Sequence, residues 1–98
     1  MTKNLQIAVI GAGLMGHGIA LTFARAGQYV TMHDPVDEML RSTPQRISES
    51  LRLLGASDTE ITKALKKIEL CSSIRTAVED AAFVFEAAPE KLGLKQSI

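Results

Sequence analysis

Apolar and polar positions divide this chain into short apolar runs separated by longer segments with a helical period. Four runs have the length and composition of buried strands: 5–10, 28–33, 68–72 and 83–86. Four segments have the residue types or the apolar spacing of helices: 19–26, 36–54, about ten residues after Ser57, and 76–80. Ile68 fits either the third helix or the third strand. Strands that alternate with helices predict an α/β fold with a parallel sheet.

Local signals mark where these helices begin and end. Gly27 and Gly55 stand where a C′ glycine closes a helix, and Pro44 interrupts or bends the segment 36–54. Ser57 and Glu60 have the spacing of a capping box, which predicts a helix start at this point.

A glycine motif lies between the first apolar run and the first helix. Its residues are Gly11, Ala12, Gly13, Leu14, Met15 and Gly16. A G-x-G-x-x-G motif in a strand–turn–helix context is the fingerprint of a dinucleotide pyrophosphate site. Gly11 allows the sharp exit from the strand, Gly13 lets the backbone approach the pyrophosphate, and Gly16 lets helix and strand pack closely. The motif predicts a Rossmann-type doubly wound parallel sheet.

An acidic residue follows the second strand, roughly 20 residues beyond the glycines, as the fingerprint requires. This residue is Asp34, and Pro35 and Val36 follow it where an NADP enzyme would carry an arginine. A carboxylate there accepts hydrogen bonds from the adenosine ribose and repels a 2′-phosphate. The predicted cofactor is therefore NAD rather than NADP.

Composition narrows the remaining possibilities. The 98 residues carry 11 basic and 11 acidic side chains, so no net charge favours nucleic acid or an anionic membrane as a partner. Four glycines interrupt the apolar stretch 5–26, which argues against a signal peptide or membrane helix and predicts a cytoplasmic protein. A single cysteine, Cys71, and two separated histidines, His17 and His33, give no support for a metal site. We expect Cys71 to pack beside the third strand, His17 to be a helix-start residue, and His33 to be half-buried.

Two longer segments carry a more specific signal. Residues 10–20 read IGAGLMGHGIA, and residues 86–95 read EAAPEKLGLK. Both resemble segments of one enzyme family, the NAD-dependent 3-hydroxyacyl-CoA dehydrogenases, in which the second reads E-A-x-P-E-x-L-x-L-K. The resemblance places the pyrophosphate on the glycine motif and the adenosine ribose on Asp34. It also implies that Ala87, Glu90 and Lys95 lie near the nicotinamide half of NAD.

The resemblance further implies what this chain lacks. In the family, the catalytic His–Glu pair and the Ser and Asn that hold the substrate lie downstream of the matching segments. We therefore expect residues 1–98 to be the N-terminal part of an NAD-binding domain, incomplete at the C-terminus and inactive alone, without the helical domain for substrate and dimerisation. The whole protein is expected to be a homodimer that transfers hydride from an (S)-3-hydroxyacyl-CoA to NAD.

Three alternatives remain open at this point. A lambda-crystallin-like dehydrogenase of a sugar acid such as gulonate, or of carnitine, shares both motifs. A non-catalytic module could bind the dinucleotide alone. A structural piece could pair its exposed sheet edge with another chain.

Overall fold

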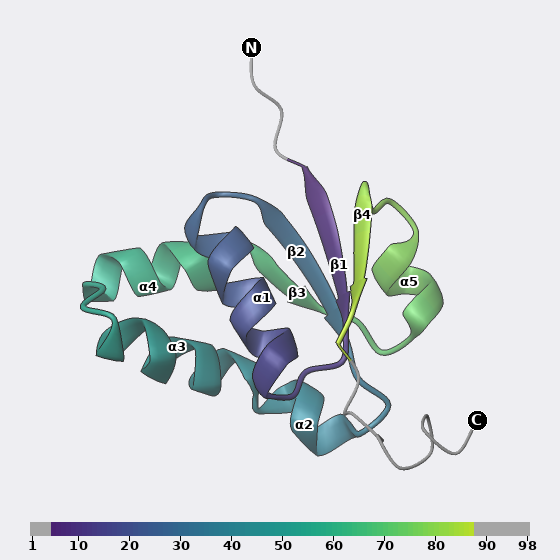
Figure 1. Cartoon of the computed structure of the whole chain (residues 1–98), viewed down its shortest axis with the longest axis horizontal. Coiled ribbons are helices and arrows are strands. Elements are labelled where there is room, and N and C mark those ends of the chain that lie inside the picture. The colour runs from purple at the N-terminus through teal and green to yellow at the C-terminus, as the bar shows by residue number, and fades with distance from the viewer. Residues whose placement is uncertain (1–4, 88–98) are drawn as a thin grey trace, which may run out of the picture.

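The computed structural model describes residues 5–87 and shows a four-stranded parallel sheet with helices on both faces (Figure 1). The strands are β1 (Gln6–Ile10), β2 (Tyr29–His33), β3 (Ile68–Leu70) and β4 (Phe83–Glu86). Their order across the sheet is β3-β2-β1-β4, and all three pairings are parallel. This order matches the first four strands of the doubly wound order 3-2-1-4-5-6 and confirms the predicted fold class.

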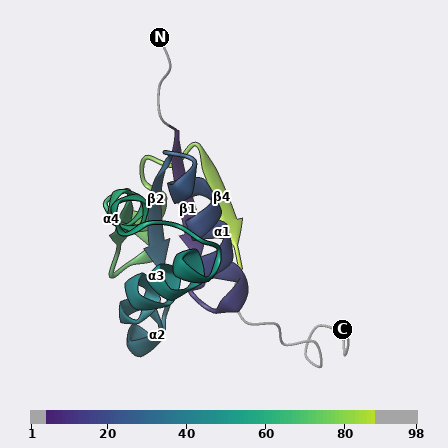
Figure 2. The ribbon, with the colours of Figure 1, turned by 90° about the vertical axis from the view of Figure 1, so that its left-hand side faces the viewer.

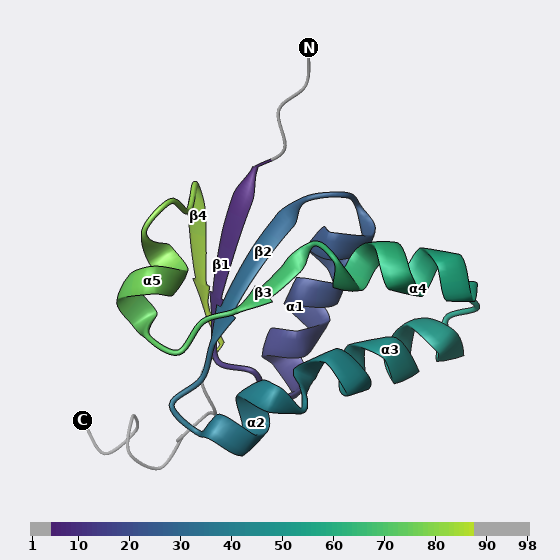
Figure 3. The same ribbon diagram turned by 180° about the vertical axis from the view of Figure 1, so that it is seen from behind.

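The helices are α1 (Leu14–Arg25), α2 (Asp37–Arg41), α3 (Thr43–Leu53), α4 (Asp58–Leu65) and α5 (Ile74–Val78). α1 packs on β1 and β2, and α3 and α4 pack against α1 and each other (Figures 1 and 2). α5 contacts the same two strands and lies apart from the other helices (Figure 3).

Side-chain alternation along β2 shows that α5 covers the opposite face. Val30 and Met32 are buried in the core that α1, α3 and α4 share. Thr31 points the other way, and its hydroxyl donates to the Ala77 carbonyl of α5 at 2.6 Å. Successive strand residues face opposite sides of a sheet, so the two helix layers enclose it. The core of the larger layer includes Ile7, Val9, Val30, Met32, Ala20, Ala24, Ile47, Leu51 and Ile61.

The segment 36–54 forms two helices, so of the two expectations for Pro44 the interruption is confirmed and the bend is not. α2 ends at Arg41, and Pro44 lies in the first turn of α3. Proline is tolerated there because the first N–H groups of a helix have no intrahelical partner. The helix expected at 76–80 runs instead from Ile74 to Val78.

The predicted end signals are confirmed. Gly27 and Gly55 have φ of 93° and 91°, in the left-handed region that favours glycine after a helix. Ser57 and Glu60 form a complete capping box at the start of α4. Cys71 directly follows β3, is 4% exposed, and donates its N–H to Met32. His33 is buried rather than half-buried, and its Nδ1 lies 2.9 Å from the Cys71 carbonyl oxygen.

Candidate dinucleotide site

The glycine motif forms a tight turn from the carboxyl end of β1 into α1. Gly11 has φ of 107°, and its N–H donates to the His33 carbonyl at 2.7 Å. A Cβ on Gly16 would lie only 1.7 Å from the Gly11 carbonyl oxygen, so no larger residue fits there. A Cβ on Gly13 would have no heavy atom within 4 Å. The turn is therefore closed on the side of Gly16 and open on the side of Gly13.

The open side is also the N-terminal end of α1. Gly13 is its N-cap, no side chain caps it, and the first turn contains no acidic residue. Leu14 and Met15, the first two residues of α1, are 84% and 69% exposed, so neither is buried against the turn. Free N–H groups and the positive end of a helix dipole favour an anion.

Asp34 directly follows β2 and lies against this turn. Its carboxylate accepts hydrogen bonds from the N–H groups of Ala12 and Val36, each at 2.7 Å. Asp34 is 5% exposed. A carboxylate offers about four lone-pair positions, so it can accept from ribose hydroxyls in addition to these two bonds.

Ala87 closes the site from the end of β4. Its N–H donates to the Ile10 carbonyl at 2.7 Å, and its Cβ is 3.7 Å from the position of a Cβ on Gly16. The structure thus brings Ala87 to the glycine turn, at the carboxyl edge of the sheet where such folds bind ligands. Glu90 and Lys95, the other two residues expected near the nicotinamide, lie outside the described residues.

Arg46 and His17 contact the turn although the motif did not assign them to it. Arg46 of α3 donates to the Ala12 carbonyl. His17 is buried, with Nδ1 3.3 Å from the Gly13 carbonyl oxygen and Nε2 3.1 Å from the Ser50 hydroxyl. His17 thus joins α1 to α3 rather than acting only as a helix-start residue. No sequence signal points to Arg46, because its contact depends on how α3 packs across the turn.

A depression of about 270 Å³ lies elsewhere, at the amino edge of the sheet. Its lining residues are Ala24, Arg25, Gly27, Glu60, Lys63, Ala64 and Lys67. They come from the end of α1 and from α4, far from the glycine turn, so this depression is not the dinucleotide site. Within residues 5–87 no three His, Cys, Asp or Glu side chains are grouped as metal ligands, and no helix is long and apolar enough to cross a membrane.

The geometry fits a dinucleotide. The clear space over Gly13 leaves room for a pyrophosphate beside the backbone, and the first turn of α1 presents N–H groups without a competing carboxylate. Asp34 sits at the adjacent strand end, where a ribose linked to that pyrophosphate would lie.

Comparison with known proteins supports the same conclusion. Residues 6–98 match the family model for the 3-hydroxyacyl-CoA dehydrogenase, NAD binding domain. A probable 3-hydroxyacyl-CoA dehydrogenase of Caenorhabditis elegans is 34% identical over all of this chain and 36% of its own length. An L-carnitine dehydrogenase/betainyl-CoA thioesterase of Rhizobium meliloti is 33% identical over all of this chain and 20% of its length.

A solved structure shows the same arrangement. The (S)-3-hydroxybutyryl-CoA dehydrogenase of Ralstonia eutropha superimposes with a TM-score of 0.81 and 30% identity, over 95% of this chain and 34% of that one. The chain thus spans between a fifth and about a third of the length of these relatives. On the matched family model and the shared fold, the chain belongs to the 3-hydroxyacyl-CoA dehydrogenase family, within its NAD-binding domain.

Proposed function

We propose that this chain provides the cofactor site of an enzyme that oxidises the 3-hydroxyl group of an (S)-3-hydroxyacyl-CoA. The observation that carries the proposal is the position of the Asp34 carboxylate, bonded to Ala12 at the open glycine turn. NAD, when bound, supplies the hydride acceptor of the reaction. The chain's own residues bind and orient it. The glycine turn of residues 11–16 holds the pyrophosphate through backbone N–H groups from Gly13 onward, because those of Gly11 and Ala12 already donate within the fold. Asp34 holds the adenosine ribose.

Ala87, Glu90 and Lys95 complete this proposed site on the side of the nicotinamide. Neither His17 nor His33 serves as the base that takes the substrate proton, because both rings are engaged with their neighbours in the fold. The base is proposed to come from the part of the whole protein beyond this chain. Consistent with that assignment, the 98-residue chain is expected to leave NADH absorbance unchanged when mixed with acetoacetyl-CoA.

The experiment that tests the site is calorimetric titration of the wild-type chain and of Asp34→Ala with NAD and NADP. Hydrogen bonds to a charged group contribute about 1.5–3 kcal/mol, so Asp34→Ala is expected to weaken NAD binding by roughly 10- to 150-fold. The substitution removes the repulsion of a 2′-phosphate, so the preference for NAD over NADP should also fall. Equal affinity of the wild type for the two cofactors would contradict the role of Asp34. Because Asp34 also bonds Ala12 and Val36, circular dichroism must show that the variant is folded.

A second candidate substrate is a hydroxy acid that is not a CoA ester. The similarity to an L-carnitine dehydrogenase supports it, since that relative matches over the whole of this chain. Oxidation of carnitine, gulonate and 3-hydroxybutyryl-CoA by the whole protein, followed through NADH formation, distinguishes the candidates. A homodimeric whole protein and a cytoplasmic location also remain proposals, which sedimentation and cell fractionation test.

A further inference from the structure

Arg46 reaches from α3 to the glycine turn with its donors directed at several partners. Its Nε donates to the Ser42 hydroxyl at 3.0 Å, and its Nη2 donates to the Met39 carbonyl at 3.1 Å and to the Ala12 carbonyl. Its Nη1 lies 3.5 Å from Nδ1 of His17. A guanidinium held at three points has little freedom left, so the turn is tied to the junction of α2 and α3.

The contact with Ala12 determines how one peptide plane of the turn is oriented. In a trans peptide the carbonyl and the following N–H point in opposite directions, and the described residues contain no cis peptide. Arg46 holds the Ala12 carbonyl toward α3, and so the Gly13 N–H points away from α3. Within residues 5–87, no hydrogen bond uses that N–H. The preceding N–H, that of Ala12, already donates to Asp34.

We propose that Arg46 is a positioning residue that orients the Gly13 N–H toward the pyrophosphate before the dinucleotide binds. This inference rests on the proposed function, which places the pyrophosphate on the glycine turn. The carboxylate of Asp34 and the guanidinium of Arg46 hold the two polar groups of Ala12 from opposite elements. The turn is thereby preorganised: its backbone is already ordered in the folded chain, so binding the dinucleotide costs less conformational entropy.

The anchorage of α3 itself supports this role. His17 of α1 lies against the Ser50 hydroxyl one turn further along α3, so the two helices are joined at a second point. Ile47, next to Arg46, is completely buried in the core. The base of the Arg46 side chain is therefore fixed by packing, and its tip by hydrogen bonds.

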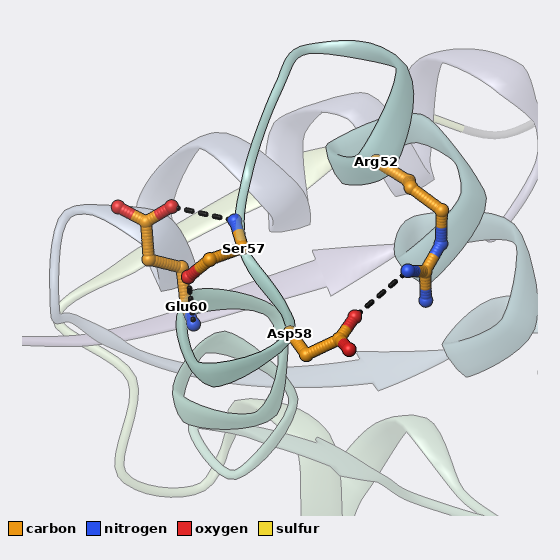
Figure 4. Close-up of polar contacts among 4 residues, drawn as sticks. All are labelled: Arg52, Ser57, Asp58 and Glu60. Atoms are coloured by element: carbon orange, nitrogen blue, oxygen red, sulfur yellow. Dashed lines mark hydrogen bonds and ion pairs between the residues drawn. The ribbon is translucent and has the colours of Figure 1, made fainter.

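The test compares Arg46→Met with Arg52→Met in the full 98-residue chain. Arg52 lies on the same helix, and within residues 5–87 its side chain forms one ion pair, an exposed one with Asp58 at 2.8 Å (Figure 4). Exposed ion pairs contribute little, so Arg52→Met should behave as the wild type. Each protein is titrated with NAD, ADP and adenosine, using nuclear magnetic resonance for the weak ligands. Adenosine carries the ribose hydroxyls but no phosphate.

Arg46→Met is expected to weaken NAD and ADP binding by about tenfold, as for loss of one hydrogen bond to a charged group, and to change adenosine binding less than about twofold. If Arg46 only stabilised the fold, its loss would weaken the binding of all three ligands equally. Unchanged NAD binding, or an equal loss of affinity for all three ligands, would overturn this inference but leave the proposed function standing. A wild-type chain that binds none of the ligands would overturn the proposed function, and the inference with it.

A second variant covers the case in which Arg46→Met does not fold. Arg46→Lys keeps the charge but cannot donate to Ala12 and Ser42 at once from a planar fork. Like Arg46→Met, it should weaken the binding of NAD and ADP more than the binding of adenosine. An equal change in the affinities for all three ligands would again reject the role of Arg46.

Discussion

Two glycines of one motif have different tasks at the level of single residues. Gly16 is required by the fold, because a Cβ there would overlap the Gly11 carbonyl. Gly13 is not: its φ of −74° and ψ of −161° suit any residue, and the space beside it is clear. A glycine that the fold does not need, at the centre of a binding motif, indicates a requirement of the ligand.

Gly13→Val therefore should fold but not bind NAD, because its branched side chain fills the space proposed for the pyrophosphate. Circular dichroism and calorimetry measure the two properties separately. Gly18→Ala is the matched control, since a Cβ at Gly18 also meets nothing within 4 Å but lies more than one helical turn away from the N-cap. Normal NAD binding by folded Gly13→Val would show that the phosphate site is misplaced.

Gly16→Ala should instead fail at folding. With a Cβ 1.7 Å from a backbone oxygen, either α1 or the end of β1 must move. We expect loss of the cooperative thermal transition by circular dichroism. A stably folded Gly16→Ala chain would contradict the packing of the turn.

At the scale of elements, the start of α4 is held by reciprocal hydrogen bonds between two residues of its own first turn and cap (Figure 4). The Ser57 hydroxyl accepts from the Glu60 N–H at 3.2 Å, and the Glu60 carboxylate accepts from the Ser57 N–H at 2.8 Å. Ser57→Ala should lower the free energy of unfolding by about 1 kcal/mol, because it leaves an N–H of the first turn without its partner. Urea denaturation measures this change. Thr59→Ala, at an exposed position of the same helix, is the control.

The same cap predicts a pH dependence. The hydrogen bond from the Ser57 backbone holds the pKa of Glu60 below its ordinary value of 4.5. A lowered folded pKa means that the ionised form stabilises the fold; this contribution is present above pH 4.5 and is lost as the pH falls through the folded pKa. Glu60→Gln keeps a capping side chain without the charge. The stability difference between Glu60→Gln and the wild type should therefore shrink on acidification, and a constant difference would contradict this assignment.

How far the sequence predicts an element depends on whether its cause is local. The cap at Ser57 and the glycine helix ends were predicted because each depends on residues within a few positions. The β-α-β unit was predicted because its strands, glycine motif and acid follow a fixed spacing along the chain. The break between α2 and α3 was predicted only as one of two possibilities, since Pro44 is compatible with a bend as well as with a helix start. Arg46 was missed because its contact with Ala12 joins residues 34 positions apart, through packing that no spacing encodes.

At the scale of the whole molecule, β4 lies at an edge of the four-stranded sheet and presents apolar side chains. Phe83, Val84 and Phe85 are 55%, 49% and 37% exposed, and only β1 pairs with this strand among the described residues. Such an edge favours pairing with another chain. We expect the 98-residue chain to self-associate, with a sedimentation coefficient that rises with concentration, and Val84→Lys to reduce this association. A chain that stays monomeric at every concentration would contradict the prediction.

Ligand binding should also act on the whole molecule. A ligand that binds only the folded state stabilises it; at 100 times the Kd the gain is about 2.7 kcal/mol. We expect NAD to raise the melting temperature of the wild type but not of Gly13→Val. Differential scanning fluorimetry with and without NAD compares the two chains. Equal shifts in both would indicate binding away from the glycine turn.

Because the native thiol at the end of β3 is buried, an introduced surface cysteine can be labelled selectively. Cys71 is the single cysteine of the sequence, and burial raises the pKa of its thiol, so little reactive thiolate is present near neutral pH. A cysteine placed by Thr62→Cys on the exposed surface of α4 would react with a maleimide dye well before Cys71 does. Donor- and acceptor-labelled chains can therefore be prepared without replacing the native cysteine, and energy transfer between them would follow the meeting of two copies directly.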